Sequence, residues 1–230
     1  EQRQWTQAEE YYQKALQIYI EFKDRYSQAR TYHNLGIVAQ EQRQWTQAEE
    51  YYQKALQIYI EFKDRYSQAR TYHNLGIVAQ EQRQWTQAEE YYQKALQIFI
   101  EFKDRYEQAR TYHNLGIVAQ EQRQWTQAEE YYQKALQIKI EFKDRYSQAR
   151  TYHQLGRVAE EQRQWDVAKE NLLKSLEIFV DFGDQQSGTI ALSNLAKLWQ
   201  ATTDQRVLAE VARILGISQE EARKLLKGDG

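Results

Sequence analysis

The chain has 230 residues, of which 31 are Lys or Arg, 33 are Asp or Glu and none is Cys, so its formal net charge is −2. The lack of Cys excludes disulfides and Cys-based metal or redox sites, and the nearly neutral balance does not favour binding to nucleic acid. No stretch approaches the roughly 18 consecutive apolar residues of a membrane span, and no signal segment is evident. We therefore expect a cytoplasmic protein, excised from a longer one, that binds neither membrane nor nucleic acid.

The sequence repeats with a period of 40 residues, and its first two copies are identical. The changed residues in the third and fourth copies are Phe99, Glu107, Lys139, Gln154, Arg157 and Glu160. Residues 161–200 keep the frame only loosely, which is typical of a terminal repeat that meets water instead of another copy. We predict a repeat array over residues 1–202, starting inside a repeat, and a separate two-helix capping segment over residues 203–230.

Each repeat is predicted to contain two helices. Thr46, followed three residues later by Glu49, indicates a capping box at the start of one helix. The apolar residues of this helix step by four and three, at Ala48, Tyr52, Ala55, Tyr59 and Phe62. A short turn lies before it near Trp45, and the segment KDRYSQ is predicted to connect it to the next helix. That next helix runs from Ala69 to about Gln82, with its stripe at Tyr72, Leu75, Gly76 and Ala79.

These stripes predict the core. Small residues such as Gly36 and Ala48 are expected where helices approach closely, and the aromatic residues Tyr32, Trp45, Tyr52 and Phe62 are expected to be buried. One position of the second helix holds Tyr59, Phe99 or Lys139 in successive copies. Because it accepts a charge, we place it at the margin of the core, where a lysine stem can lie on apolar surface with its ammonium in water.

This frame resembles the tetratricopeptide repeat family, which has Leu-Gly in the first helix and a small-aromatic-small spacing in the second. Leu35, Gly36, Ala48, Tyr52 and Ala55 match that motif. The period of 40 exceeds the 34 of the family, and the extra residues are expected to lengthen the second helix and its connector, as in kinesin light chains and the sensor arms of bacterial signalling ATPases. The resemblance implies an all-α, right-handed superhelical solenoid of antiparallel helix pairs, whose first helices line a concave groove.

The face of the first helix outside the core stripe is predicted to line this groove. The candidate peptide-binding residues are Arg30, His33, Asn34, Ile37, Arg70, His73, Asn74, Ile77, Arg110, His113, Asn114, Ile117, Arg150, His153, Gln154, Arg157, Asn194 and Lys197. In family terms, Asn34 and its equivalents occupy the position of an asparagine ladder that holds the backbone of a peptide. An amide both donates and accepts hydrogen bonds, so it can match any peptide unit. The alternative is an exposed or helix-packing asparagine.

The charges of this face suggest the kind of ligand. Arg30 and its equivalents could donate to acidic groups, and the replacement of Ile37 equivalents by Arg157 and Lys197 makes the groove more basic toward its C-terminal end. The favoured interpretation of these charges is a solvated face, and the alternative is a site for an acidic or carboxylate-bearing ligand. Protonation of the four histidines near their usual pKa of about 6.5 is predicted to make the groove more basic still.

Catalysis finds no support in the sequence. Each of the four histidines lies in a different repeat without a Cys or Asp beside it, and no phosphate-binding glycine loop or nucleophile motif occurs. We predict no enzyme activity, no cofactor and no metal. In the C-terminal segment, Asp204 and Ser218 are expected to cap two short helices, and the apolar residues that would cover the last repeat are Val207, Val211, Ile214 and Leu225. DNA binding by this segment is the weaker alternative.

The sequence thus predicts a non-enzymatic scaffold that binds a protein or an extended peptide, as the recognition or sensor arm of a larger signalling protein. The alternative is a structural, self-assembling array, natural or designed, with no separate ligand. The first predicted second-type helix, from Thr6 to about Lys23, lacks most of its own partner helix. Its apolar face is therefore expected to mediate end-to-end self-association.

Overall fold

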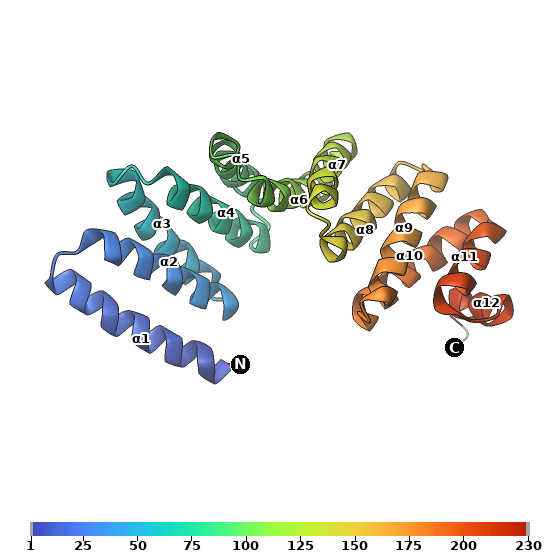
Figure 1. Ribbon diagram of the computed structural model, residues 1–230, viewed down its shortest axis with the longest axis horizontal. Helices are drawn as coiled ribbons and strands as arrows, with labels where there is room; N and C mark the ends of the chain where they lie inside the picture. The colour runs from blue at the N-terminus through green and yellow to red at the C-terminus, as the bar shows by residue number, and fades with distance from the viewer. Residues whose placement is uncertain (1, 229–230) are drawn as a thin grey trace. The chain divides into compact units, whose positions relative to one another are not determined.

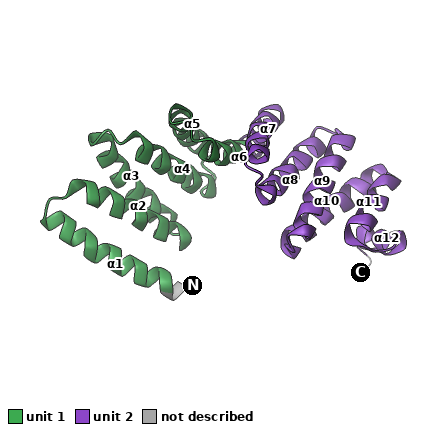
Figure 2. Cartoon of the chain, in the orientation of Figure 1, with its two compact units in different colours: residues 1–118 green, residues 119–230 purple. Residues whose placement is uncertain are grey.

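The computed structural model describes residues 2–228, which form twelve helices and no strand (Figure 1). The helices are α1 (Gln2–Glu21), α2 (Arg25–Glu41), α3 (Trp45–Glu61), α4 (Arg65–Glu81), α5 (Trp85–Glu101), α6 (Arg105–Glu121), α7 (Trp125–Glu141), α8 (Arg145–Glu161), α9 (Trp165–Asp181), α10 (Gln185–Thr202), α11 (Gln205–Leu215) and α12 (Gln219–Lys227). The chain divides into two compact units, residues 1–118 and 119–230 (Figure 2). In each unit, successive helices pack as antiparallel pairs, which confirms the predicted all-α solenoid fold.

The two helices of a repeat are equally long. Helices α3 and α4 have 17 residues each, and three residues join each of them to the next helix. The two halves of the 40-residue repeat are thus equal in helix length and connector length, and the lengthening of the second helix relative to the family's 34-residue repeat stays a prediction. Of the segment predicted to connect the two helices, only Lys63 and Asp64 lie outside a helix, because α4 already begins at Arg65.

The helix ends are closed by main-chain geometry and by aspartate caps. The Asp64 carboxylate accepts a hydrogen bond from the main-chain N–H of Ser67 at 3.0 Å, which satisfies an orphan donor of α4. At the other end of the repeat, α3 begins at Trp45 without a side-chain cap. The predicted capping box of Thr46 and Glu49 is thus wrong, because Thr46 is already helical. In the connections between α1 and α10, the middle residue, such as Lys63 with φ 56°, adopts the left-handed conformation that commonly ends a helix.

Close helix packing explains the small residues of the motif. Ala48, Tyr52 and Ala55 are fully buried. A Cβ atom placed on Gly36 would lie 2.6 Å from the ring of Tyr52, so the glycine is required by the approach of α2 to α3. Phe62, in contrast, is 52% exposed, and its predicted place in the core is wrong, because α3 has ended at the residue before it.

The position shared by Tyr59, Phe99 and Lys139 is a core position, and its predicted place at the margin is wrong. These side chains are 4%, 0% and 8% exposed, respectively. The Lys139 ammonium stays inside because α8 offers it acceptors: Nζ donates to Thr151 Oγ1 at 2.7 Å and to the main-chain oxygen of Ser147 at 3.3 Å. Burial lowers the pKa of Lys139 to about 8.

The two C-terminal helices pack against the last helix pair. Val207 and Val211 of α11 share one apolar cluster with α9 and α10, and the cluster also includes Leu226 of α12, which is fully buried. Leu225, which was predicted to cover the last repeat, is 42% exposed because α12 turns the next residue inward instead. The predicted caps are present: Asp204 accepts from the N–H of Arg206, and Ser218 forms a capping box with Glu221. We propose that residues 203–230 cap the array, as expected from the sequence.

Candidate functional site

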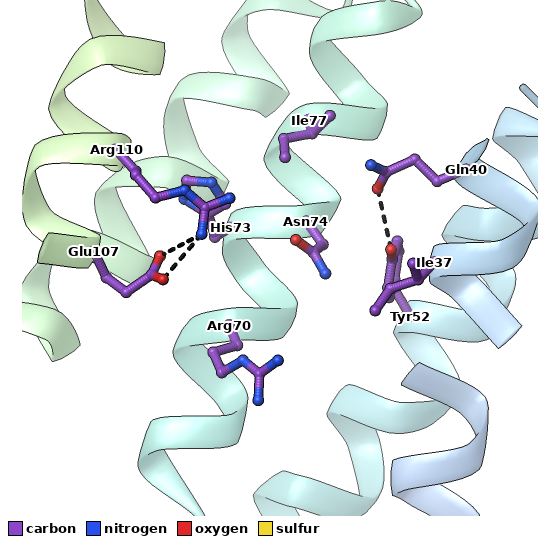
Figure 3. A pocket seen from close by; sticks show the side chains of 9 residues that line it. All are labelled: Ile37, Gln40, Tyr52, Arg70, His73, Asn74, Ile77, Glu107 and Arg110. Carbon is purple, nitrogen blue, oxygen red and sulfur yellow. Dashed lines mark hydrogen bonds and ion pairs between the residues drawn. The ribbon is translucent and has the colours of Figure 1, made fainter. Parts of the chain in front are cut away.

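One face of α4 forms the wall of a pocket in the first unit. The pocket has a volume of about 250 Å³, and α2, α3 and α6 contribute the other lining residues (Figure 3). The lining residues are Ile37, Gln40, Tyr52, Arg70, His73, Asn74, Ile77, Glu107 and Arg110. The structure therefore brings together six of the predicted groove residues, and it adds Gln40, Tyr52 and Glu107.

The histidines of this unit are buried, and the prediction that they titrate near their usual pKa is wrong. His33 and His73 are 6% and 2% exposed. Desolvation, together with the positive charge of Arg70 or Arg110, lowers the pKa of His33 to about 4 and that of His73 to about 3. Both rings are neutral near physiological pH, so they do not make the groove more basic.

Hydrogen bonds across the repeat boundary hold these rings in place. His33 Nδ1 lies 3.1 Å from Thr71 Oγ1, and Asn74 Nδ2 lies 3.4 Å from His33 Nε2. The Tyr52 hydroxyl donates to Gln40 Oε1 at 3.0 Å. The Asn74 amide is therefore not free to rotate, because its nitrogen already has a partner within the protein.

The arginines of the pocket differ in their pairing. Arg110 Nη1 donates to the Glu107 carboxylate at 2.9 Å, whereas Arg70 is exposed and forms no ion pair with the residues described. Copies of the repeat other than the third carry Ser in place of Glu107. In the third copy, Glu107 thus pairs with the charge of Arg110. The Arg70 guanidinium has no such partner among the residues described and could pair with an anionic group.

A second pocket lies in the second unit and has a volume of about 620 Å³. Its lining residues are Gln120, Glu121, Arg123, Trp125, Arg157, Glu160, Glu161, Asn194 and Lys197. Burial raises the pKa of Glu160 to about 7, although Arg157 and Lys197 act in the opposite direction. Arg157 Nη1 donates to Gln154 Oε1 at 3.2 Å, so one acceptor position of the Gln154 carbonyl is used within the protein.

The other predicted groove residues line neither pocket. They are Arg30, His33, Asn34, His113, Asn114, Ile117, Arg150, His153 and Gln154. Two lining residues that sequence reasoning missed, Glu107 and Glu160, are positions where one copy departs from its sisters. Differences between copies are thus a signal that could have found them.

Among the described residues, no group of three or more His, Cys, Asp or Glu side chains is arranged to hold a metal ion. Within the same residues, every helix is too short or too polar to cross a bilayer.

Comparison with known proteins identifies the family. The sequence profile of the tetratricopeptide repeat family matches residues 1–61, 67–141 and 107–181. The chain belongs to the tetratricopeptide repeat family. No match was found among curated proteins.

Solved structures show the same fold at low sequence identity. BtubC (BKLC) from P. vanneervenii is similar with a TM-score of 0.76 and 21% identity, over 98% of this chain and 92% of that one. A signal transduction ATPase with numerous domains from Pyrococcus horikoshii, which carries a tetratricopeptide repeat sensor, gives 0.70 and 17%, over 94% and 38% of the two chains. YrrB, described as a tetratricopeptide repeat protein with an unusual peptide-binding site, gives 0.61 and 18%, over 91% and 98%.

Proposed function

We propose that this chain is a non-enzymatic scaffold that binds an extended peptide along the first-type helices, as the sensor or recognition arm of a larger cytoplasmic protein. The observation that supports it most is the pocket on α4, where the unpaired Arg70, the carbonyl of Asn74 and the apolar Ile77 converge. A cation, an acceptor and an apolar surface together suit a peptide with an acidic side chain.

The family and its structural relatives support this proposal. Tetratricopeptide repeats are binding scaffolds, and each repeat offers a similar surface beside the next. The relatives include one protein described by its peptide-binding site and one in which the repeats form the sensor of an ATPase. A peptide partner is therefore the first class of ligand to test for this chain.

The proposal predicts that Arg70→Ala weakens peptide binding about tenfold, because one charge-assisted hydrogen bond is lost. Peptides would be selected from a random displayed library on the wild-type chain, and their dissociation constants measured by calorimetry. Lys63→Ala is the matched control, since Lys63 is an exposed cation in a turn outside the pocket. Selected peptides that lose no affinity with Arg70→Ala, or lose as much with Lys63→Ala, would contradict the proposed site.

A second candidate function, self-assembly, is favoured by the exposed face of α1. Ile18 is 52% exposed, whereas its equivalent Ile58 in the next copy is 2% exposed. Tyr11, on the same helix, is 65% exposed. Such apolar surface tends to find a partner, and a second copy of this chain would provide one.

Self-assembly predicts that this chain forms dimers at about 100 μM, and that Ile18→Glu abolishes them by placing a charge on the shared surface. Sedimentation velocity measures both. Gln17→Glu is the control, because Gln17 is exposed and polar already. A wild-type chain that stays monomeric, or an Ile18→Glu variant that still dimerises, would count against this function.

A further inference from the structure

A chain of buried hydrogen bonds links adjacent repeats and determines which atoms the groove presents. It begins at Thr71, whose Oγ1 lies 2.8 Å from the main-chain oxygen of Ser67. A carbonyl oxygen can only accept, so the one hydroxyl proton of Thr71 is donated there. Thr71 Oγ1 must therefore accept its other hydrogen bond, at 3.1 Å, from His33 Nδ1.

The tautomer of His33 follows from this bond. The ring is 6% exposed and neutral, so it carries one proton, and that proton is on Nδ1. Nε2 of His33 is then an acceptor, and the group 3.4 Å from it must be the amide nitrogen of Asn74 and not its oxygen. The orientation of the Asn74 amide is thus fixed by accounting for protons, without seeing a hydrogen atom.

The amide nitrogen of Asn74 also faces Tyr52. The Tyr52 hydroxyl gives its proton to Gln40 Oε1 at 3.0 Å, and the Asn74 side chain opposes the rise that burial causes in the pKa of Tyr52, as an amide N–H facing the phenol oxygen would. Figure 3 shows the nitrogen of Asn74 on the side of Tyr52 and its oxygen on the other side. With its nitrogen held by His33 and facing Tyr52, Asn74 presents its Oδ1 to a ligand.

The same order occurs at the next repeat boundary of the first unit. Thr111 Oγ1 donates to the main-chain oxygen of Glu107 at 2.8 Å and lies 3.0 Å from His73 Nδ1. Asn114 Nδ2 lies 3.5 Å from His73 Nε2, Tyr92 donates to Gln80 Oε1 at 3.1 Å, and Asn114 opposes the rise that burial causes in the pKa of Tyr92. Two identical chains of bonds make this a property of the repeat.

In the last repeat only part of this chain of hydrogen bonds is present. Asn194 Nδ2 still lies 2.8 Å from His153 Nε2. However, Ala191 stands at the position of Thr71 and Leu172 at the position of Tyr52, so neither end of the chain of bonds is present there.

We propose that the threonine–histidine pairs His33–Thr71 and His73–Thr111 orient the asparagines beside them, so that Asn74 and Asn114 act only as hydrogen-bond acceptors and the ligand supplies the donors. The donors that fit are neutral main-chain N–H groups of a peptide, because the neighbouring Arg70 disfavours a cationic donor. This inference rests on the proposed function, and it replaces the expectation that each amide both donates to and accepts from a peptide.

The first test is spectroscopic and needs no ligand. Long-range proton–nitrogen correlation spectra of the nitrogen-15-labelled chain, near neutral pH, distinguish the two histidine tautomers. We expect His33 and His73 with the proton on Nδ1. Thr71→Val removes the acceptor and is expected to shift the tautomer of His33 alone, while Thr111→Val, the matched control, shifts that of His73 alone. Protons on Nε2 in the wild type, or tautomers unchanged in both variants, would overturn the orienting role.

The second test asks what the oriented amides select. The probe is an oligoglutamate peptide, compared with an analogue in which ester linkages replace alternate amides and remove their N–H groups. We expect the analogue to bind about tenfold more weakly, and the difference to shrink when Thr71→Val and Thr111→Val are combined. Equal binding of the two probes would overturn the acceptor-only groove. Absence of binding by both, with the expected tautomers, would count against the proposed function and leave the orientation standing.

Discussion

Acidification from pH 6.5 to about 4.5 is expected to cost the first unit about 4 kcal/mol of its free energy of unfolding through His33 and His73 alone. Burial lowers both pKa values in the folded chain, to about 4 and about 3, below the ordinary 6.5. In this pH window the unfolded chain binds more protons than the folded one, so stability falls as pH falls. Each histidine contributes about 2 kcal/mol.

The measurement is hydrogen exchange of α2 and α4 amides as a function of pH, because a repeat array opens locally and a single global transition is not assured. The double variant His33→Gln and His73→Gln separates the histidines from the carboxylates that also titrate in acid. Between pH 6.5 and 4.5, the free energy of unfolding of this double variant should fall by about 4 kcal/mol less than that of the wild type. Parallel declines in the two proteins would mean that the rings are accessible and titrate normally.

Replacing the buried lysine is expected to stabilise the second unit. Lys139→Phe should raise its free energy of unfolding by about 3 kcal/mol near neutral pH, because Phe99 and Phe179 already fill the equivalent positions at 0% and 3% exposure. Burial lowers the pKa of Lys139 from 10.5 to about 8, so below pH 8 the folded state carries the full cost of a charged ammonium.

The pH dependence identifies the origin of this gain. Between pH 8 and 10.5, Lys139 loses its proton in the folded chain but keeps it in the unfolded chain. The free energy of unfolding of the wild type therefore rises over this range, and the difference in free energy of unfolding between Lys139→Phe and the wild type becomes smaller. Hydrogen exchange of α7 and α8 follows both proteins. Lys139→Met keeps the length of the side chain and removes its charge, so its difference in free energy of unfolding from the wild type should also become smaller between pH 8 and 10.5. A constant difference across this range would assign the gain to aromatic packing instead of charge.

Much of the fold was predictable because repetition makes equivalent residues visible. The spacing of Ala48, Tyr52 and Ala55 predicted a packed helix face, and these residues are fully buried. Gly36 was expected where helices approach closely, and the ring of Tyr52 lies against it. These predictions succeeded because they depend on helical periodicity and side-chain size, which are local properties of the sequence.

The helix boundaries were less predictable. Thr46 and Glu49 have the spacing of a capping box, yet α3 already starts at Trp45 and has no side-chain cap. The side chain that caps a helix in this repeat is Asp64, at the start of α4. Phe62 continues the apolar spacing of α3 but lies beyond its last residue and is half exposed. Pattern alone does not locate a helix end, because the left-handed residue that ends the helix is Lys63, which carries no sequence signal of its own.

The sequence by itself determined the helix pairs, the repeat unit, the family and the face of the first helix that carries Arg70 and Asn74. Only the tertiary structure decided that His33 is neutral, that Lys139 lies inside, and that the amide nitrogen of Asn74 faces His33. Burial and proton sharing depend on groups that are 38 or 41 residues apart in the chain and meet only when one repeat packs on the next. A period shows that such positions recur, but the direction of a hydrogen bond between them is set by the partners that packing provides.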